Sequence, residues 1–404
     1  MNELKIDTVD TLIISIIVLY LGNVLTRLIR PLQKYSIPQA VTGGLIVSFT
    51  ILIVSKLGGP QIAFAMELRD ALLLAFFSTI GLSAKFSKLK EGGKPLLILL
   101  TCASVFLIVQ NGTGVLLANL FGAHPGYGLF AGSVSFAGGH GTAIAWGQEA
   151  EAAGLDQAGL VGIAFATFGL IAGGIIGGPV AEMLIKKNKL DPATSDQEQP
   201  MMVSAEPEKK LEPVTMRRAL STVFTLAICI SVGSLVNRFF FSAGVMLPGF
   251  LTAMMVGIII TNLSGVFKKE IRQSDFDKVG EGALQLFLAM SLMSLDLQSL
   301  ASAMGVVFTV LVIQVIVITI FAVFIVFRVM GKTYDAAVIC AGFTGLGLGA
   351  TPVAIANMNA VTSKYGPSFQ AFLVVPLVGA FFMDLINALV IKFFLGLPMM
   401  QGVM

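Results

Sequence analysis

The hydrophobic pattern of the chain consists of long apolar runs separated by short polar stretches. A helix needs about 20 apolar residues to cross a hydrocarbon core about 30 Å thick, and most of the runs approach that length. In the first half they fall at residues 8–26, 38–55, 70–84, 96–121, 127–146 and 159–185. In the second half they fall at residues 219–241, 246–266, 281–295, 304–327, 334–359 and 368–397. The pattern predicts an all-α polytopic membrane protein.

Two of the runs are interrupted by polar segments rich in glycine. Residues 137–142 read AGGHGT, and residues 345–352 read GLGLGATP. Backbone without helical hydrogen bonds is tolerated at membrane depth only where it is buried in protein or lines a cavity. Both segments are therefore candidate binding sites, although glycine also allows close helix packing in membranes. Close packing is the interpretation we favour for the glycines of the flanking run, which are Gly173, Gly174, Gly177 and Gly178.

The composition agrees with a membrane protein and limits the chemistry. Of 404 residues, 56% are hydrophobic and 12% are charged, and the mean hydropathy is +0.89. Charged residues gather in residues 186–218, which predicts a solvated linker. The net charge of +3 indicates no nucleic-acid partner. Cys102, Cys229 and Cys340 lie in apolar runs without metal-ligand spacing, so we expect neither a disulfide framework nor a metal centre.

The two halves of the chain resemble each other. GNVLTR at residues 22–27 matches GSLVNR at residues 233–238. The two glycine-rich segments match each other at nearly the same offset in residue number. The sequence of residues 172–186 likewise resembles that of residues 378–392. Matches in the same order indicate an internal duplication. The predicted domains are an N-terminal repeat at 1–185, a linker at 186–218 and a C-terminal repeat at 219–404.

The distribution of basic residues predicts the orientation of the chain. If each glycine-broken run dips into the membrane and returns, each half crosses five times. With both termini outside, the inside loops then hold all but five of the 26 basic residues, as the positive-inside rule requires. The exceptions are Lys5, Lys56, Arg69, Arg238 and Lys392. The first run lacks a basic leader and a cleavage site, so we expect it to be a retained helix and not a signal peptide.

An odd number of crossings places the second repeat upside down relative to the first. The re-entrant hairpins, predicted near residues 127–158 and 334–366, then enter from opposite faces, and their tips meet near the midplane. Inverted repeats with broken helices are the architecture of many secondary transporters.

The residues at the two tips suit the binding of an anion. Thr351 followed by Pro352 predicts a helix start, and Thr142 is the corresponding predicted cap. A helix N-terminus carries about half a positive charge, which favours a nearby carboxylate. His140, one of two histidines, is either a donor to substrate or a residue that shapes the loop. The candidate substrate-binding residues are Gly138, Gly139, His140, Gly141, Thr142, Gly347, Gly349, Thr351 and Asn357.

Polar side chains inside other runs are candidate ligands for a cation. Asp384 lies in the middle of the last run with Asn387 one turn later, and a carboxylate at that depth is by default functional. Sodium, like other hard cations, prefers oxygen ligands. Gln110, Asn111 and Gln314 could supply further oxygens, although hydrogen bonding between helices explains a lone amide almost as well.

Several long strings of the chain resemble a known family. FAGGHGTAIAW at 136–146, GLGLGATPVAIANM at 345–358, AFLVVPLVGAFFMDLINALVIK at 371–392 and RDALLLAFFSTIGL at 69–82 are similar to strings of the bacterial sodium/glutamate symporters. The resemblance covers nearly the whole chain apart from the linker and the ends. It implies sodium-coupled uptake of L-glutamate across the inner membrane, two inverted five-helix halves with paired re-entrant hairpins, and a homodimer with an elevator-like motion. Phe343 is a departure, because some members carry histidine there.

The predicted function is therefore that of a sodium-coupled glutamate symporter without a cofactor, with sodium as the coupling ion. The alternative is a sodium- or proton-coupled carrier for another small carboxylate or amino acid. An intramembrane enzyme would need a nucleophile with a base, or a set of metal ligands, and His140 with Asp384 supplies neither. A channel would be lined by rings of groups from subunits around an axis, which an inverted duplication in one chain disfavours.

Overall fold

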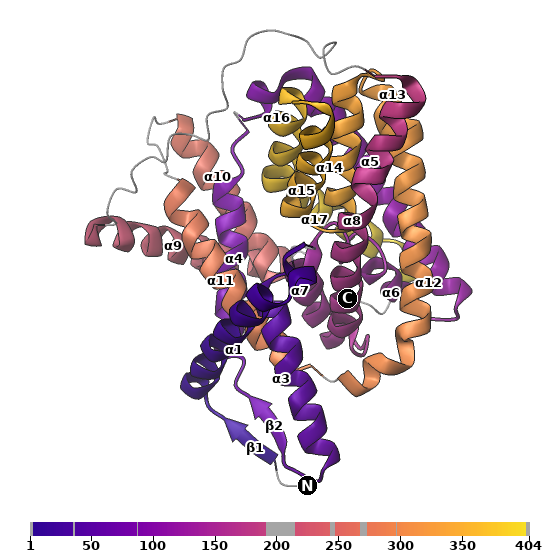
Figure 1. The fold of residues 1–404 in the computed structure, drawn as a ribbon. Helices are drawn as coiled ribbons and strands as arrows, with labels where there is room; N and C mark the ends of the chain where they lie inside the picture. The colour runs from indigo at the N-terminus through magenta and orange to yellow at the C-terminus, as the bar shows by residue number, and fades with distance from the viewer. Residues whose placement is uncertain are drawn as a thin grey trace.

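The chain folds into packed helices with a small pair of strands (Figure 1). The computed structural model describes residues 3–34, 37–86, 88–190, 215–242, 247–266, 273–295 and 297–400. The first half contains β1 (Glu3–Ile6), α1 (Thr8–Leu28), α2 (Arg30–Lys34), α3 (Gln39–Lys56), β2 (Gln61–Phe64), α4 (Glu67–Ser83), α5 (Lys88–Leu120), α6 (Pro125–Phe130), α7 (Gly139–Ala152) and α8 (Ala158–Asn188). Most of the predicted linker lies outside the described residues.

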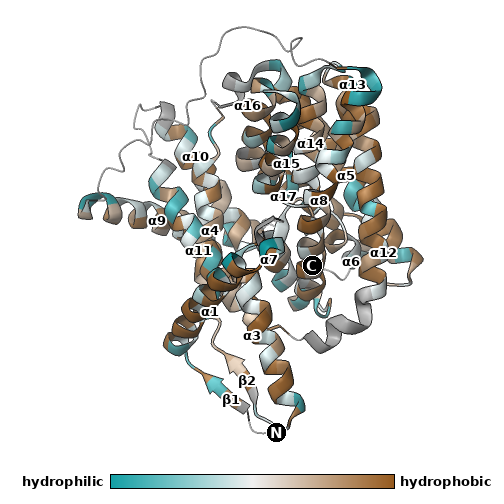
Figure 2. Cartoon of the chain, viewed as in Figure 1, coloured by the Kyte–Doolittle hydropathy of each residue, from teal (hydrophilic) through white to brown (hydrophobic). Residues whose placement is uncertain are grey.

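The second half begins with four long helices and ends in shorter and bent ones. It contains α9 (Met216–Ser242), α10 (Gly249–Val266), α11 (Gln273–Met293), α12 (Leu297–Phe321), the π-helix η2 (Ala322–Val326), α13 (Phe327–Val329), α14 (Tyr334–Leu348), α15 (Thr351–Tyr365), α16 (Phe369–Leu377), the π-helix η3 (Val378–Phe382), α17 (Met383–Leu395) and the 3₁₀ turn η4 (Pro398–Met400). Most residues of the long helices are hydrophobic (Figure 2).

Length and composition identify six described helices that could cross a membrane, or seven if the bent pair Phe369–Ala380 and Met383–Leu395 forms one span. This confirms a polytopic helical membrane protein. Ten crossings and inverted repeats stay predictions, because several helices are too short or too polar for that criterion. The expectation of a wholly α-helical chain is wrong in one detail, since β1 and β2 form a parallel pair. Each strand has four residues, too few for the alternation of side chains to be recognised in the sequence.

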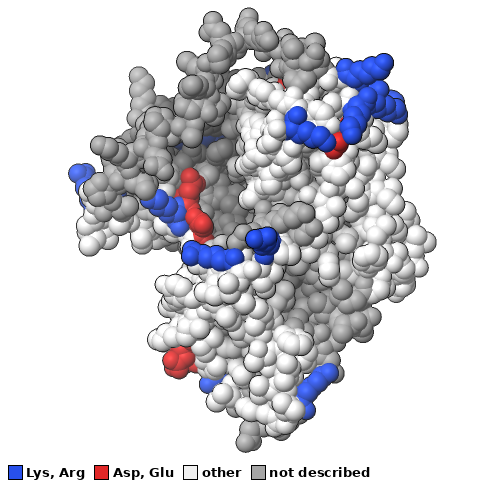
Figure 3. All heavy atoms as spheres, in the orientation of Figure 1, with Lys and Arg blue, Asp and Glu red and all other residues white. Residues whose placement is uncertain are grey.

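The helices pack into two groups (Figure 1). One group, called here the α4 group, contains α1, α3, α4, α9, α10 and α11. The other, the α8 group, contains α5, α6, α7, α8, α12, α14, α15, α16 and α17. The first three long helices of each half thus join one group, and the later helices join the other. Few residues connect the groups, and on the face in Figure 3 the surface is hollowed between them.

Equivalent glycines hold the first two long helices of each half together. A methyl group on Gly22 of α1 would lie 1.9 Å from the carbonyl oxygen of Gln39 at the start of α3. A methyl group on Gly233 of α9 would lie 2.7 Å from Cα of Ala253 in α10. Both positions therefore need glycine because the neighbouring backbone occupies the space of a side chain.

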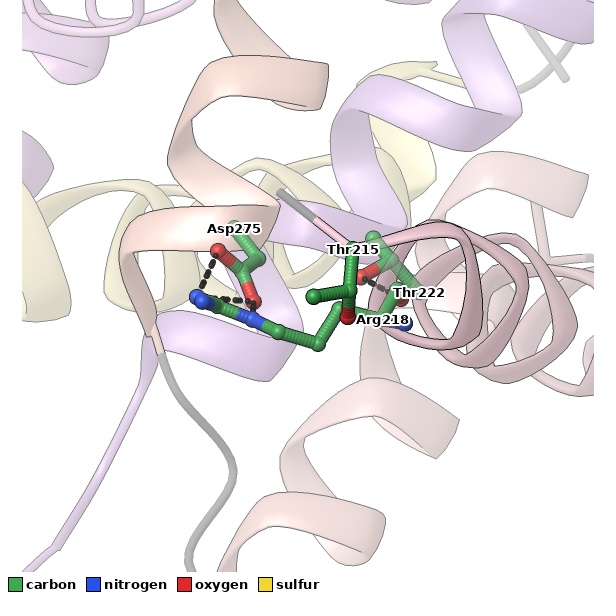
Figure 4. Close-up of polar contacts among 4 residues, drawn as sticks. All are labelled: Thr215, Arg218, Thr222 and Asp275. Atoms are coloured by element: carbon green, nitrogen blue, oxygen red, sulfur yellow. Dashed lines mark hydrogen bonds and ion pairs between the residues drawn. The ribbon is translucent and has the colours of Figure 1, made fainter. Parts of the chain in front are cut away.

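An ion pair fastens α9 to α11 within the α4 group (Figure 4). Nη2 of Arg218 lies 2.8 Å from Oδ1 of Asp275, and Nε donates to Oδ2 at 3.2 Å. The side chains are only 24% and 16% exposed. Thr222 donates to the carbonyl oxygen of Arg218 at 3.1 Å, which anchors the same turn of α9. A two-pronged, partly desolvated arginine–carboxylate pair is among the stronger polar contacts in proteins.

Replacing Arg218 with methionine is expected to lower the free energy of unfolding by about 1.5–3 kcal/mol, because Asp275 would lose its charged donor. Thermal unfolding of the purified protein in detergent would measure the change as a lower midpoint temperature. Arg217→Met is the matched control, since Arg217 is exposed. Equal midpoints for the two variants would contradict a stabilising role for the pair.

Candidate functional site

A cavity of about 290 Å³ lies where the two glycine-rich segments meet, between the α4 group and the α8 group. Both segments were predicted as binding sites from the sequence. The predicted residues that line the cavity are Gly138, Gly139, His140, Gly141, Thr142, Gly349, Thr351 and Asp384. Among its described lining residues Asp384 is the only carboxylate, and none is lysine or arginine. The cavity is therefore a small, mostly apolar site with one acidic group.

The first segment is a series of tight turns between α6 and α7. The N–H groups of Gly138 and Gly139 donate to the carbonyl oxygens of Ser133 and Ser135, both at 2.9 Å. Gly139 has a φ of +69°, which glycine adopts without steric cost. A methyl group on Gly139 would lie 3.8 Å from the carbonyl oxygen of Gly349, so the two breaks approach each other here.

The start of α7 differs from the prediction. α7 begins at Gly139 after the N-cap residue Gly138, and Thr142 lies inside its first turn. The predicted capping role of Thr142 is therefore wrong, because the left-handed conformation of Gly139 lets the helix begin three residues earlier than the threonine. The Thr142 side chain still lines the cavity.

The second segment is a short extended break between α14 and α15. α14 ends at Leu348, and Ala350 is extended, with φ −163° and ψ 168°. α15 then begins at Thr351 and Pro352, which confirms the predicted helix start. The N-cap residue is Ala350, and no described side chain caps this N-terminus, so the predicted capping by the Thr351 hydroxyl is wrong. Ala350, Thr351, Pro352 and Val353 line the cavity. Free N–H groups of the first turn of a 15-residue helix are thus close to the cavity.

The two helix groups supply different walls of the cavity. The α4 group contributes an apolar wall made by Pro38, Phe76, Ile80, Leu284 and Leu288. The α8 group contributes the polar wall with both glycine-rich segments. A methyl group on Gly141 would lie 3.3 Å from both Cε1 of Phe76 and Cδ1 of Leu284, so the tip of the first segment contacts the apolar wall closely.

Two further contacts of α7 cross the boundary between the groups. The ring of Trp146 packs edge-on against Phe250 of α10, with ring centroids 5.5 Å apart. When the amide of Gln148 is oriented by its hydrogen bonds, its oxygen accepts from Nε and Nη2 of Arg69 in α4 at 3.2 Å. Arg69 also pairs with the neighbouring Asp70 at 2.8 Å, so its role here is a contact between helices.

Thr167 of α8 holds the side chain of His140. Its Nε2 lies 2.9 Å from Oγ1 of Thr167, whose own proton is donated to the carbonyl oxygen of Ile163 at 2.9 Å. A hydroxyl has one proton to donate, so Nε2 of His140 must be the donor to Thr167. This tautomer, assigned from hydrogen bonding, leaves Nδ1 of a neutral imidazole as an acceptor.

Asp384 follows an irregular turn of the last helical segment. Residues Val378–Phe382 form a π turn in which the N–H of Met383 donates to the carbonyl oxygen of Val378. The helical segments on either side of this turn are bent by 49°. A methyl group on Gly379 would lie 2.5 Å from Oγ1 of Thr351, so the turn packs against the start of α15. The π turn thus places Asp384 and Thr351 on the same cavity.

Two predicted substrate-binding residues lie behind the lining. Nδ2 of Asn357 donates to the carbonyl oxygens of Gly173 at 2.9 Å and Ala341 at 3.3 Å, so it joins α15 to α8 and α14. A methyl group on Gly347 would lie 2.5 Å from Cδ1 of Ile318, and the carbonyl oxygen of Gly347 accepts from Nε2 of Gln110 at 2.8 Å. Both residues therefore shape the second segment.

The predicted cation ligands other than Asp384 are gathered outside the cavity. Gln110, Asn111, Gln314 and Asn387 are each at most 1% exposed. They contact the backbone of residues 131–133 or one another, and they are not among the residues that line the cavity. The sequence thus identified a polar cluster, but it did not separate the cluster from the cavity.

Ser133, Ser135 and the apolar wall were not predicted from the sequence. Both serines are fully buried in the turns that lead to the first segment. The string GSVSFAGG, with two serines in an apolar run directly before the glycines, was the available signal. Phe76, Leu284 and Leu288 carried no signal, because their helices are apolar over most of their length.

The comparison with known proteins gives a single result. The sequence profile of a family described as sodium/glutamate symporter matches residues 4–367. The chain is 43% identical over 399 residues to the sodium/glutamate symporter of Escherichia coli (strain K12), covering 98% of this chain and 99% of that protein. It is 43% identical over 389 residues to the sodium/glutamate symporter of Haemophilus influenzae (strain ATCC 51907 / DSM 11121 / KW20 / Rd), covering 96% of each chain. The similarity extends over nearly the whole chain.

Proposed function

The chain belongs to the sodium/glutamate symporter family, and from this membership we propose that it imports L-glutamate together with sodium ions across the bacterial inner membrane. Its relatives are named as symporters and not as enzymes. The observation that carries the proposal is the cavity formed jointly by the two glycine-rich segments, with a helix start and one carboxylate on its wall.

Glutamate is bound, in this proposal, by the polar wall of the cavity. The first-turn N–H groups of α15 and the hydroxyls of Thr142 and Thr351 are the donors for a substrate carboxylate, because a helix N-terminus favours an anion. His140 and the backbone of Gly138, Gly139, Gly141 and Gly349 complete the site, and Gly347 and Asn357 hold the second segment in place. Phe76 and Leu284 cover the methylene groups.

Sodium is bound at the same time, with Asp384 as the charged ligand. A carboxylate next to an anionic substrate is unfavourable unless a cation lies between them. Asp384 lines the cavity, and none of the described lining residues is a lysine or arginine that could neutralise its charge. A sodium ion at Asp384 would therefore assist glutamate binding, which is the thermodynamic basis of coupled transport.

The transport step is an elevator-like movement of the α8 group past the α4 group. The polar wall belongs to one group and the apolar wall to the other, and few residues join the groups.

In this proposal α6–α7 and α14–α15 are re-entrant hairpins of two inverted five-helix repeats. α7 and α14, with 14 and 15 residues, are short for a span, which supports re-entry. The termini lie outside, the linker is cytoplasmic, and the protein is a homodimer.

Counterflow of labelled glutamate into proteoliposomes tests the function. The purified chain is expected to exchange internal unlabelled glutamate for external label, saturably and only with sodium present. No exchange with sodium and glutamate would refute the proposal. Exchange of another carboxylate or amino acid, or coupling to protons instead of sodium, would support the alternative carrier.

Thr351→Ala is expected to weaken glutamate binding about tenfold, because a hydrogen bond to a charged group is worth about 1.5–3 kcal/mol. Thr142→Ala should act in the same direction. Binding is measured by isothermal titration at saturating sodium. Thr362→Ala is the matched control on α15, because its hydroxyl donates to the carbonyl oxygen of Met358 at 3.0 Å, far from the helix start. Wild-type affinity in both Thr142→Ala and Thr351→Ala would exclude the hydroxyls from the site.

At least two sodium ions are expected to accompany each glutamate. One sodium ion only neutralises the charge of glutamate, whereas a second adds about 2.3 kcal/mol of driving force per 100 mV of membrane potential. Reversal-potential measurements on proteoliposomes with fixed gradients give the ratio directly. A ratio of one sodium ion per glutamate would be incompatible with this expectation.

A further inference from the structure

A cluster of buried polar side chains lies behind the cavity and is not used by the substrate site. Its members come from α5, α12, α17 and the turns before α7. Each member has a buried side-chain polar atom without a hydrogen-bond partner in the described part of the chain, and each is at most 1% exposed. These residues are Gln110, Asn111, Ser133, Ser135, Gln314 and Asn387.

Three of the four amides in this cluster use their N–H groups and leave their oxygens free. Asn111 is the exception, because its Oδ1 accepts a hydrogen bond and its Nδ2 has no partner in the described part of the chain. Nε2 of Gln110 donates to the carbonyl oxygen of Gly347, and Nε2 of Gln314 donates to that of Ala131, both at 2.8 Å. Nδ2 of Asn387 donates to the carbonyl oxygen of Ser133 at 3.0 Å. Because these bonds fix the orientation of the amides, Oε1 of Gln110, Oε1 of Gln314 and Oδ1 of Asn387 are the atoms without partners.

Ser133 is the centre of the cluster. Its N–H donates to Oδ1 of Asn111 at 2.7 Å, and its carbonyl oxygen accepts from Asn387. Asn111 and Asn387 therefore hold both sides of one residue, while the hydroxyl of Ser133 has no partner in the described part of the chain. The segment continues from Ser133 to Gly138 and Gly139, which line the cavity. A change at the cluster would thus be transmitted directly to the substrate site.

Unpaired oxygens in a protein interior need a ligand. Each buried polar group left unsatisfied costs about 1–3 kcal/mol, so four oxygens without partners in one buried cluster are unfavourable unless something binds them. A hard cation can be coordinated by several neutral oxygens at once, whereas a water molecule has only two protons to donate. The described residues hold no group of three or more His, Cys, Asp or Glu side chains that would favour a transition metal.

The cluster is close to Asp384, the only carboxylate among the described residues that line the cavity. Asn387 follows Asp384 by three residues in α17, so the two side chains lie about one helical turn apart on the same face. Asp384 faces the cavity, and Asn387 faces Ser133. The negative charge of Asp384 would lower the cost of placing a cation among neutral oxygens at this distance.

We propose that Ser133, Asn387, Gln110 and Gln314 form a second sodium site, separate from Asp384, with the Ser133 hydroxyl and three amide oxygens as ligands. Asn111 positions Ser133 through its Oδ1. This inference rests on the proposed sodium-coupled transport and adds the place of a second ion. Occupation of the site would fix the turns that lead to Gly138 and Gly139, and sodium would then bind before glutamate.

Sodium binding without glutamate tests the second site. Equilibrium binding of ²²Na⁺ to the purified full chain is expected to show two ions per chain in the wild type. Ser133→Ala removes an unpaired hydroxyl without breaking a hydrogen bond, and it should reduce the affinity of one ion at least tenfold. Ser133→Cys, with a sulfur that hard cations bind poorly, should do the same. Ser104→Ala in α5 is the matched control, since its hydroxyl donates to the carbonyl oxygen of Leu100 at 2.8 Å.

Each outcome has a distinct meaning. Two ions bound with wild-type affinity in both Ser133 variants would show that the cluster holds water, and would overturn the second site while leaving sodium-coupled transport intact. One ion in the wild type would overturn the second site as well. Absence of sodium binding in the wild type would instead refute the proposed function. Loss of one ion in the Ser133 variants, with the Ser104→Ala protein unchanged, would establish the site.

Discussion

Replacing Asp384 with asparagine is expected to raise the sodium concentration that half-activates glutamate uptake by about one hundredfold. An ion about 4 Å from a carboxylate at an effective dielectric constant of about 20 gains about 4 kcal/mol. Asparagine keeps one oxygen ligand but loses the charge, so most of this energy is lost, and about 2.7 kcal/mol corresponds to one hundredfold. Sodium activation of uptake into proteoliposomes measures the change.

Asp70→Asn is the control for this substitution, because Asp70 is 56% exposed and pairs with Arg69 away from the cavity. It is expected to leave sodium activation unchanged. If Asp384→Asn also shows wild-type sodium activation, Asp384 is not an ion ligand, and its position in the cavity wall would need another explanation. A fall in maximal uptake without a change in sodium dependence would likewise exclude Asp384 from the ion site.

Gly177→Ala is expected to reduce uptake more than tenfold, whereas Gly178→Ala should have almost no effect. A methyl group on Gly177 would lie 2.2 Å from Nδ2 of Asn357 and 2.8 Å from the carbonyl oxygen of Ala341. Either α15 moves away from α8 or the Asn357 hydrogen bonds break, and overpacking of this kind costs about 1–3 kcal/mol. The displaced helix carries Thr351 and the cavity wall.

Gly178→Ala is a matched control for Gly177→Ala. A methyl group on Gly178 would meet no described residue within 4 Å. The two variants have the same composition and the same helix propensity, so they differ only in what the added methyl group contacts. Uptake and the midpoint of thermal unfolding should be measured for both. Similar values in the two proteins would mean that the Asn357 contact with α8 does not position the second glycine-rich segment.

The sequence predicted the helices and the two breaks because their signals are local. Long apolar runs specify the helices, and the glycine-rich strings specify the places where helical hydrogen bonding stops. Thr351 with Pro352 marked a helix start correctly, since proline lacks the N–H that a first turn leaves free. Thr142 was also predicted to open a helix, although Ala143 and not proline follows it. The positive φ at Gly139 depends on the turns before it and was not visible in the threonine itself.

The division into two helix groups could not be predicted from the sequence. It depends on which faces of apolar helices touch, and the outer and inner faces of a membrane protein are nearly equally apolar. Phe76 and Leu284 therefore gave no sign that they form a cavity wall. The same limit applies to Gln110 and Gln314, whose place inside apolar runs was visible in the sequence, although their separation from Asp384 follows only from the packing of α5, α12 and α17.

The position of Trp146 gives the protein a built-in optical probe. It is the only tryptophan of the chain, and its 1% exposed indole lies on α7 against Phe250 of α10, at the boundary between the two groups. Movement of one group past the other would separate these rings and admit water or lipid. Intrinsic fluorescence of the unlabelled protein would then report the movement as a change in emission wavelength, with a time resolution that transport assays lack.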